Sequence, residues 1–454
     1  MTYLKRGQTS GTSRRTFTVS TWVKLTSGSD NEQRIFDGYD GGGYYFYWKI
    51  RTVGNGHTMQ VFNTQSSAGG TNIDLITNRK FRDYNSWYHF CLQVDTTQST
   101  ASNRVKIYVN GVQETSFSTA TYPPINTDLP VSVPAGADYY IGKENTAEYL
   151  LSHYYYVDGS IIDVGQFGSV DSTTGEWKIN TSPTIASYGT NGFAVLKDGT
   201  TITDQSPNSN NLTSHGTGIT KTEDCPSNVF ATWNPNLAMN STMTLANGNT
   251  TGTTGSNYAS GASNCWFSTM GVSSGKWYVE IKQSAGTNNQ GQQLGIGYDL
   301  PKFQQGSGVN AYNVGYISEG WGYLGSEGRV VNNNNGVLTG LSTWTIGDTI
   351  GIALDLDNYK LYFRKNGGSW ENSGNPESGS TGTGAISLTT GKTYFFGVSD
   401  ASLSNTYTFQ ANFGSAPYAI SSGNQDGNDR GNFEYAVPSG YLAICTKNLS
   451  EALS

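Results

Sequence analysis

The sequence predicts an all-β chain built from two antiparallel concanavalin-like β-sandwiches (jelly rolls) in tandem. Three observations lead to this prediction. Short β-branched and aromatic runs alternate with a period of two residues. Clusters of Gly, Asn, Asp and Ser separate these runs roughly every 8–12 residues. Helical periodicity is almost absent from the 454 residues. Many short strands joined by such turns are typical of antiparallel sandwiches.

The first strand-rich block is predicted to span residues 1–170. Its clearest strand is 16–25, where Phe17 and Val19 point to one face and Trp22 to the other. Asn110-Gly111 follows an alternating run and predicts a two-residue hairpin turn, because a type I′ turn needs positive φ at both positions. Further strands are expected at 33–37, 43–51, 58–63, 87–94, 104–109, 138–141 and 154–162.

A second sandwich is predicted over residues 256–418, with a second hairpin signal at Asn366-Gly367. Residues 171–255 are rich in turn residues and are expected to form a connector with few strands. Residues 419–454 end in a last apolar run and are expected to pack back on the second block. The predicted strands of this block are 275–281, 293–298, 314–318, 349–355, 359–364, 385–388, 392–398 and 407–412.

Composition and charge exclude several kinds of partner. Charged residues make up 13% of the chain, about half the usual share, so Ser, Thr, Asn, Gln and Gly must cover the surface. The net charge of −7 argues against nucleic-acid binding, which needs clustered Lys and Arg. The one basic cluster is expected to be a solvated arm; it consists of Lys5, Arg6, Arg14 and Arg15.

Neither a membrane segment nor a secretion signal is predicted. No apolar run approaches the 18 or so residues of a spanning helix, so no membrane insertion is expected. The start of the chain lacks an apolar h-region, so we expect a protein made in a cytoplasm without a signal peptide. The four cysteines are widely spaced and predict buried thiols, with no zinc site and no disulfide framework.

No catalytic arrangement is predicted. Glycoside hydrolysis needs two carboxylates about 5–10 Å apart across a cleft. Asp355 and Asp357 lie on one face of a strand, but Asp357 heads a turn, where Asp side chains bond local backbone. No Gly-x-Ser-x-Gly elbow is present. The sequence therefore predicts a protein that is not an enzyme.

The first block resembles a laminin-G/pentraxin-like, concanavalin-A-like jelly roll. This resemblance rests on Phe17-Thr-Val-Ser-Thr-Trp-Val-Lys24, Trp87-Tyr-His-Phe-Cys-Leu-Gln-Val94 and Lys106-Ile-Tyr-Val-Asn-Gly-Val112. The second block resembles a SPRY-type sandwich, on the evidence of Gly275-Lys-Trp-Tyr-Val-Glu280, Gly347-Asp-Thr-Ile-Gly351 and Asn412-Phe-Gly414.

In its order of motifs, the whole chain resembles a structural-protein family of tailed marine bacteriophages. The motifs are Tyr3-Leu-Lys-Arg6, Ser172-Thr-Thr-Gly-Glu-Trp-Lys178, Thr220-Lys-Thr-Glu-Asp224 and Pro438-Ser-Gly-Tyr-Leu-Ala-Ile-Cys-Thr-Lys-Asn448. This resemblance implies a virion-associated protein that faces the host. It implies other virion proteins as partners and a homo-oligomer, with a trimer by analogy to fibres and spikes.

The jelly-roll resemblance raises one question about a cofactor, because such relatives often bind calcium at the sandwich rim. The candidate ligands are Asp37, Asp40, Asp158 and Asp163. Calcium needs six to eight converging oxygen ligands, and the spacing of these residues defines no such cluster. No cofactor is therefore predicted, and calcium stays an open alternative.

Aromatic side chains are the candidate ligand-binding residues, since sugars lie flat on aromatic faces with amides and carboxylates around them. Tyr44-Tyr-Phe-Tyr-Trp48 places rings on both faces of one strand, which singles out Tyr44 and Trp48. SPRY-type domains bind partners through loops at one end. That resemblance singles out Trp321, Tyr323 and Trp370 in the second block. The same side chains also fill cores and subunit interfaces.

The aromatic candidates, together with what the phage resemblance implies, lead us to expect a non-enzymatic adhesin for host-surface glycans, exposed on a phage tail fibre, tail spike or capsid. A capsid-decorating or fibre-building subunit without glycan binding is the alternative. A polysaccharide depolymerase is disfavoured because the carboxylate pair is missing. An adhesin of this kind is expected to lose binding on Trp321→Ala without unfolding.

Overall fold

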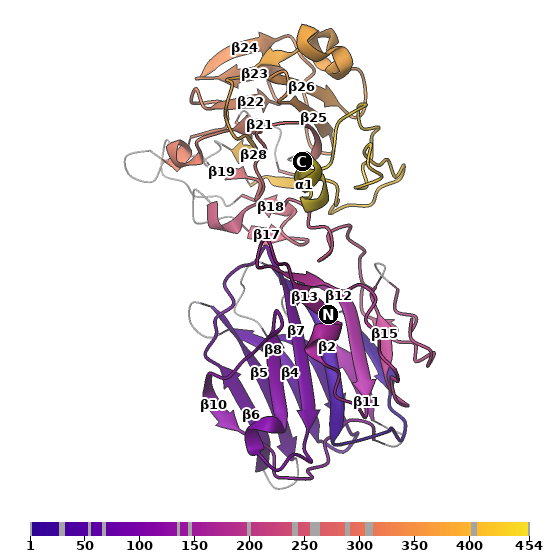
Figure 1. Ribbon diagram of the computed structural model, residues 1–454. Coiled ribbons are helices and arrows are strands. Elements are labelled where there is room, and N and C mark those ends of the chain that lie inside the picture. Colours follow the sequence, from indigo (N-terminus) through magenta and orange to yellow (C-terminus); the bar gives the residue numbers. More distant parts are fainter. Residues whose placement is uncertain are drawn as a thin grey trace. The chain divides into compact units, whose positions relative to one another are not determined.

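The structure is a computed structural model in which the chain forms two compact units, Met1–Lys221 and Thr222–Ser454 (Figure 1). Each unit is described by itself. The structure describes residues 2–26, 32–52, 56–65, 70–133, 137–143, 148–197, 201–237, 244–254, 264–286, 291–304, 312–400 and 406–452.

Unit 1 consists mainly of an eight-stranded and a six-stranded antiparallel sheet. The first has the strand order β10-β6-β5-β4-β3-β11-β1-β16 and the second β15-β12-β2-β7-β8-β9. Their strands are β1 (Tyr3–Gly7), β2 (Thr16–Leu25), β3 (Gln33–Tyr39), β4 (Tyr45–Thr52), β5 (His57–Gln65), β6 (Gly70–Thr77), β7 (Trp87–Asp95), β8 (Val105–Val109), β9 (Val112–Gln113), β10 (Phe117–Thr121), β11 (Asp138–Ile141), β12 (Tyr149–Asp158), β15 (Phe193–Val195) and β16 (Thr213–His215).

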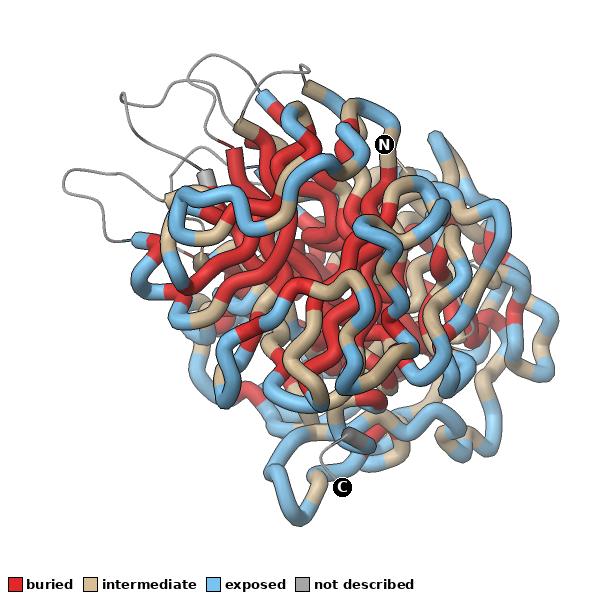
Figure 2. Tube along the Cα trace, turned by 90° about the horizontal axis from the view of Figure 1, so that it is seen from above, coloured by how far each residue is buried: buried red, intermediate tan, exposed pale blue. Residues whose placement is uncertain are grey.

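Side chains from both sheets form the core of unit 1. As predicted, Phe17 and Val19 of β2 point into it, whereas Trp22 lies on the opposite face beside His89. The Asn110-Gly111 turn between β8 and β9 is also confirmed, because both residues have positive φ, 48° and 76°. In Figure 2, buried residues follow the strands and exposed residues follow the turns.

A short hairpin packs against the outer face of the six-stranded sheet. It consists of β13 (Gly168–Val170) and β14 (Trp177–Ile179). The ring of Trp177 lies against Gly111, where a Cβ atom would come within 2.3 Å of it, and 5.8 Å from the ring of His89. This contact requires glycine at position 111. It also helps to bury the imidazole of His89 completely.

Unit 2 is built around a seven-stranded sheet, β17-β18-β29-β20-β25-β26-β27, and a six-stranded sheet, β19-β28-β21-β22-β23-β24. One core contains side chains from both. The strands are β17 (Thr244–Ala246), β18 (Thr251–Thr253), β19 (Asn264–Phe267), β20 (Lys276–Ala285), β21 (Gln293–Gly297), β22 (Gly320–Leu324), β23 (Arg329–Asn332), β24 (Asn335–Thr339), β25 (Thr349–Asp355), β26 (Lys360–Lys365), β27 (Ile386–Ser387), β28 (Phe395–Asp400) and β29 (Thr408–Asn412).

Helices are short and few in the described part of the chain. They are η1 (Ala101–Asn103), η2 (Val164–Gln166), η3 (Pro235–Leu237), η4 (Leu300–Gln304), η5 (Glu371–Ser373), η6 (Pro376–Thr381) and α1 (Thr446–Ala452). Among the described residues, none of these helices has the length and apolarity needed to cross a membrane. The all-β prediction is confirmed.

The predicted connector, residues 171–255, contributes strands to the sheets of both units. β15 pairs with β12 and β16 pairs with β1, whereas β17 and β18 extend the seven-stranded sheet of unit 2. Each of these strands is only three residues long and is flanked by turn residues, so its pairing cannot be predicted from the sequence. The predicted boundary at 255/256 lies outside the described residues.

The C-terminal segment packs on the seven-stranded sheet through a buried carboxylate. Glu280 of β20 is fully buried, and its two oxygens accept hydrogen bonds from the backbone N–H groups of Glu434 (3.0 Å) and Tyr435 (2.8 Å). The hydroxyl of Tyr278 and the amide of Asn412 donate to the same carboxylate. Burial raises the pKa of Glu280 above its usual range.

We expect Glu280→Gln to loosen this segment. A Gln side chain has one acceptor oxygen, so at least one backbone N–H would stay buried without a partner, at about 1–3 kcal/mol. Limited proteolysis should then cleave within residues 421–440 faster than in the parent chain. Glu377→Gln is the matched control, since this exposed carboxylate holds the same segment through one N–H, that of Ser439. Equal cleavage of the two variants would contradict the anchoring role.

We also expect unit 1 to lose stability in mild acid because of His89. Burial lowers the pKa of this imidazole to about 3, whereas the unfolded chain titrates near 6.5. Between about pH 3 and pH 6.5, the unfolded state binds more protons at this residue than the folded state does. The free energy of unfolding should therefore fall by about 1.4 kcal/mol per pH unit below about pH 6.5. Urea unfolding at pH 6.5 and 4.5 should show this loss in the parent chain and a smaller one in His89→Gln. Identical pH slopes would refute the assignment.

Candidate functional site

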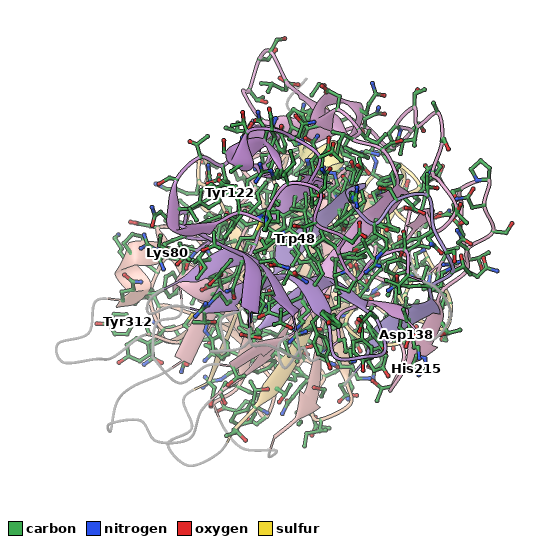
Figure 3. The ribbon with its side chains drawn as sticks, turned by 90° about the horizontal axis from the view of Figure 1, so that it is seen from below. Trp48, Lys80, Tyr122, Asp138, His215 and Tyr312 are labelled. Carbon is green, nitrogen blue, oxygen red and sulfur yellow. The ribbon has the colours of Figure 1, made fainter. Side chains whose placement is uncertain are left out.

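Three of the five predicted ligand-binding residues lie in the cores of their units. Trp48 is 0% exposed in unit 1, and Figure 3 shows it among densely packed side chains. Tyr323 is 0% and Trp321 6% exposed in unit 2. The segment 320–325 was expected to be a loop but forms strand β22, in the middle of its sheet. These three side chains therefore do not form a ligand surface.

The other two predicted residues are half-buried and engaged locally. The guanidinium carbon of Arg364 lies 4.6 Å from the centroid of the Trp370 ring. Trp370 also packs against the buried cluster that contains residues of the C-terminal segment. Tyr44 immediately precedes β4, and its backbone N–H donates to the Asp40 carboxylate at 3.0 Å. The structure brings neither residue together with other candidates.

A different set of rings lies on the outer face of the eight-stranded sheet, which we name the tyrosine face. These side chains are absent from the core of unit 1, whereas their strand neighbours Leu4, Phe46, Val61 and Ile141 belong to it. All are half-buried except Tyr140, which its neighbours cover. The rings belong to Tyr3, Tyr39, Tyr45, Tyr47, Phe62 and Tyr140.

Strand register brings the rings of the tyrosine face into contact. Tyr39 of β3 is opposite Tyr45 of β4, and their rings stack at 4.8 Å. Tyr47 is opposite Phe62 of β5, and these rings stack at 5.0 Å. Such cross-strand aromatic pairs stabilise a sheet by roughly 0.2–1 kcal/mol each. The face is therefore a rigid, pre-formed surface.

The same register continues to the far edge of the sheet. Tyr3 of β1 is opposite His215 of β16, and the two rings stack at 4.9 Å with an interplanar angle of 8°. Tyr3 also meets the edge of Tyr140 at 5.8 Å. Rings of the tyrosine face therefore extend over the neighbouring strands β5, β4, β3, β11 and β1, and the imidazole of His215 continues them onto β16.

Cationic side chains lie against these rings. The Arg34 guanidinium is 4.5 Å and the Lys49 ammonium 4.8 Å from the Tyr47 ring centroid. Lys143 lies 3.9 Å above Tyr140, and Lys5 approaches the same ring. Cation–π contacts of this kind contribute about 0.5–1 kcal/mol at exposed sites.

Carboxylates compensate most of these cations. Lys5 pairs with Asp138 at 3.0 Å, Arg34 with Asp37 at 3.5 Å, and Lys49 with Glu32. Among the described residues no carboxylate pairs with Lys143, which therefore adds a charge to a nearly neutral face. The face presents ring edges, hydroxyls, carboxylates and ammonium groups side by side.

The hydroxyls of Tyr47 and Tyr140 stay protonated in neutral solution. Burial raises the pKa of Tyr47 to about 12. The pKa of Tyr140 is also raised by burial, and its hydroxyl donates to Asp138 at 2.8 Å. Protonated phenols both donate and accept hydrogen bonds, as the hydroxyls of a sugar do.

The alternation within β4 contained the signal for this face. Phe46, Trp48 and Ile50 point inward, so Tyr45 and Tyr47 must point outward together with Lys49. Lysine follows Trp48 directly, and a charged residue rarely faces a core. Lys49 therefore indicates which face of the strand points outward. It could have identified Tyr45 and Tyr47 as surface residues in place of Tyr44 and Trp48.

The four aspartates considered for calcium do not converge. Asp158 accepts backbone N–H groups near residues 12 and 191, and Asp163 caps η2. Asp40 holds its own turn, and Asp37 lies beside Arg34. Within the described ranges, no three His, Cys, Asp or Glu side chains group as a metal site would require.

The carboxylates of the β25–β26 turn hold local structure. Asp355 is fully buried and accepts hydrogen bonds from the backbone and the side chain of Asn358. Asp357 accepts from the backbone N–H of Gly275 at 2.8 Å. Asp355 thus bonds local donors, as Asp residues in turns do. The backbone N–H that Asp357 accepts lies 82 residues away, so the prediction that it bonds backbone in its own turn is wrong.

The chain forms two all-β sandwiches in tandem, each built from antiparallel sheets. Residues 2–170 match the concanavalin A-like lectin/glucanases superfamily, in its laminin-G form. Residues 275–381 match the SPRY domain family. The chain therefore contains a laminin-G/concanavalin-like jelly roll followed by a SPRY domain.

Solved SPRY domains are similar to part of this chain. The crystal structure of the SPRY domain of human HERC1 is 21% identical, has a TM-score of 0.29 and covers 39% of this chain and 96% of its own. The crystal structure of a human SPRY domain is 16% identical and has a TM-score of 0.28. This match covers 40% of the present chain and 98% of the human domain. At these TM-scores neither structure supports an argument here. No curated protein sequence matches the chain.

We expect Trp321→Ala to destabilise unit 2. This side chain packs against Tyr298 and Tyr394 in the core, and truncating a buried Trp costs about 3–5 kcal/mol. The urea midpoint of unit 2 should fall, with any loss of binding following the loss of fold. A variant that keeps the parent midpoint but loses ligand binding would place Trp321 in a binding site.

Proposed function

We propose that this protein is a non-enzymatic adhesin that binds host-surface glycans through the tyrosine face. The observation that carries this proposal is the set of half-buried rings on one sheet face, interleaved with hydroxyls, carboxylates and ammonium groups. Pyranose rings pair their C–H groups with aromatic π-systems and their hydroxyls with such polar groups.

The proposed mechanism is many weak contacts on a rigid surface. The rings are held by their stacked partners and by cations, so little side-chain entropy is lost when a glycan binds. Single contacts of this kind give low affinity. Linking several copies raises the avidity by large factors without a new contact. We therefore propose a homo-oligomer, with a trimer as the form that suits a fibre or spike.

We further propose that the protein is exposed on the virion of a tailed bacteriophage, on a fibre, a spike or the capsid, and contacts other virion proteins there. The order of its motifs along the chain supports this assignment. A capsid-decorating or fibre-building subunit is the alternative, since stacked tyrosines also suit a protein interface. Cryo-electron microscopy of intact particles separates these outcomes. Tail-tip density favours the adhesin, a capsid lattice favours decoration, and absence from virions overturns both.

Substitution of one outward tyrosine tests the binding surface. Tyr45→Ser removes the ring that stacks on Tyr39, and we expect binding of the full-length chain to host cells or purified host polysaccharide to fall at least tenfold. The fold should hold, because Tyr45 lies outside the core of unit 1. Tyr108→Ser is the matched control, a half-buried tyrosine on the six-stranded sheet.

Both variants are to be compared with the parent chain at equal thermal stability and oligomeric state. Equal binding by all three would refute the tyrosine face as the glycan site. Release of reducing sugars from the polysaccharide by the parent chain would overturn the non-enzymatic assignment.

A further inference from the structure

Unit 2 carries a second aromatic surface, separate from the tyrosine face. Tyr312 and Tyr316 lie between η4 and β22, and their rings stack at 5.2 Å with an interplanar angle of 5°. Tyr316 is 47% exposed, although Tyr312 covers one face of its ring. A nearly parallel ring pair of this kind leaves a flat, apolar surface in contact with water.

Buried polar groups hold the loop that carries this pair. The backbone N–H of Val314 donates to the Ser399 hydroxyl at 3.0 Å, and that of Gly315 donates to the Gln293 side chain at 2.9 Å. Both acceptors belong to buried residues of the six-stranded sheet. The Tyr316 N–H closes a local turn onto Asn313 at 3.0 Å. The rings are therefore positioned before any ligand arrives.

An asparagine turn packs against the same loop. Asn333 and Asn334 join β23 to β24 with positive φ, 49° and 56°, and both are exposed. Their backbone N–H groups donate to the carbonyls of Ile317 (3.2 Å) and Gly315 (3.1 Å). The backbone of both residues is thus fixed next to the loop of the ring pair, and their carboxamide side chains are exposed there. Carboxamides donate and accept at once, as recognition of sugar hydroxyls requires.

The charges beside this loop neutralise one another. Lys302 pairs with Glu319 and, at 3.4 Å, with Asp299. The Ser318 hydroxyl donates to the same Glu319 carboxylate. The surface thus combines an apolar ring with amides and compensated charges, which suits an uncharged polyhydroxyl ligand better than an acidic one.

We propose that Tyr316, backed by Tyr312, is a binding site for neutral pyranose sugars, with the carboxamides of Asn333 and Asn334 at its side. It extends the proposed glycan binding to a second site with its own residues, so either site can fail alone. A neutral sugar would lie on the open side of the Tyr316 ring and direct its hydroxyls to the amides.

The test uses the full-length chain and immobilised neutral homopolysaccharides, namely a glucan, a mannan and a galactan. We expect the parent chain to bind at least one of them, Tyr316→Ala to weaken that binding at least tenfold, and Tyr316→Phe to retain it. Asn334→Ala should weaken it several-fold. Ile346→Ala is the matched control, because Ile346 is similarly exposed (41%) in the same unit.

The outcomes distinguish the two sites. Binding that is lost in Tyr316→Ala and kept in Tyr45→Ser supports the ring-pair site. Binding that is kept in Tyr316→Ala and lost in Tyr45→Ser overturns it and leaves the tyrosine face in place. Failure of the parent chain to bind any of the three polymers overturns the neutral-sugar assignment. Thermal unfolding of each variant shows that the fold is retained.

Discussion

Buried carboxylates that accept backbone N–H groups hold the irregular parts of this protein in place. They include Asp158, Asp204, Glu280 and Asp426, each at least nine-tenths buried. Asp158, for example, binds the N–H groups of Thr12, Ser13 and Asn191, residues far apart in the chain. Long loops cross both units, and every buried N–H in them needs an acceptor. An ionised oxygen fills this need with hydrogen bonds worth about 1.5–3 kcal/mol.

This arrangement bears on the outer faces of the two sheets in unit 1. Its loops are fastened near Asp158 and Asp204, and the β13–β14 hairpin covers the six-stranded sheet. Among the described residues, the rings on the outer face of the eight-stranded sheet are half-buried except that of Tyr140. These rings, paired across strands and capped by Arg34, Lys49 and Lys143, protect the backbone of the sheet and give the surface its chemistry.

Local signals in the sequence predicted local structure, and long-range packing decided the rest. The Asn110-Gly111 turn and the alternation in β2 depend on neighbouring residues, so the sandwiches could be predicted from them. Whether Trp321 faces the core depends on packing partners that are distant in the chain, such as Tyr394, which lies 73 residues away. Likewise, nothing near Glu280 in the chain indicates that residues 434 and 435 will bind it.

The proposed binding surfaces share one physical property, compensation of charge by close partners. Ion pairs that are already made in the free protein add little long-range attraction, and salt screens what remains. Contacts between rings and sugars respond little to salt, because they depend on dispersion and on the removal of water from apolar surface. An adhesin that works in salty water benefits from such contacts. In a chain with 13% charged residues, neutral polar and aromatic side chains are the groups most available to make them.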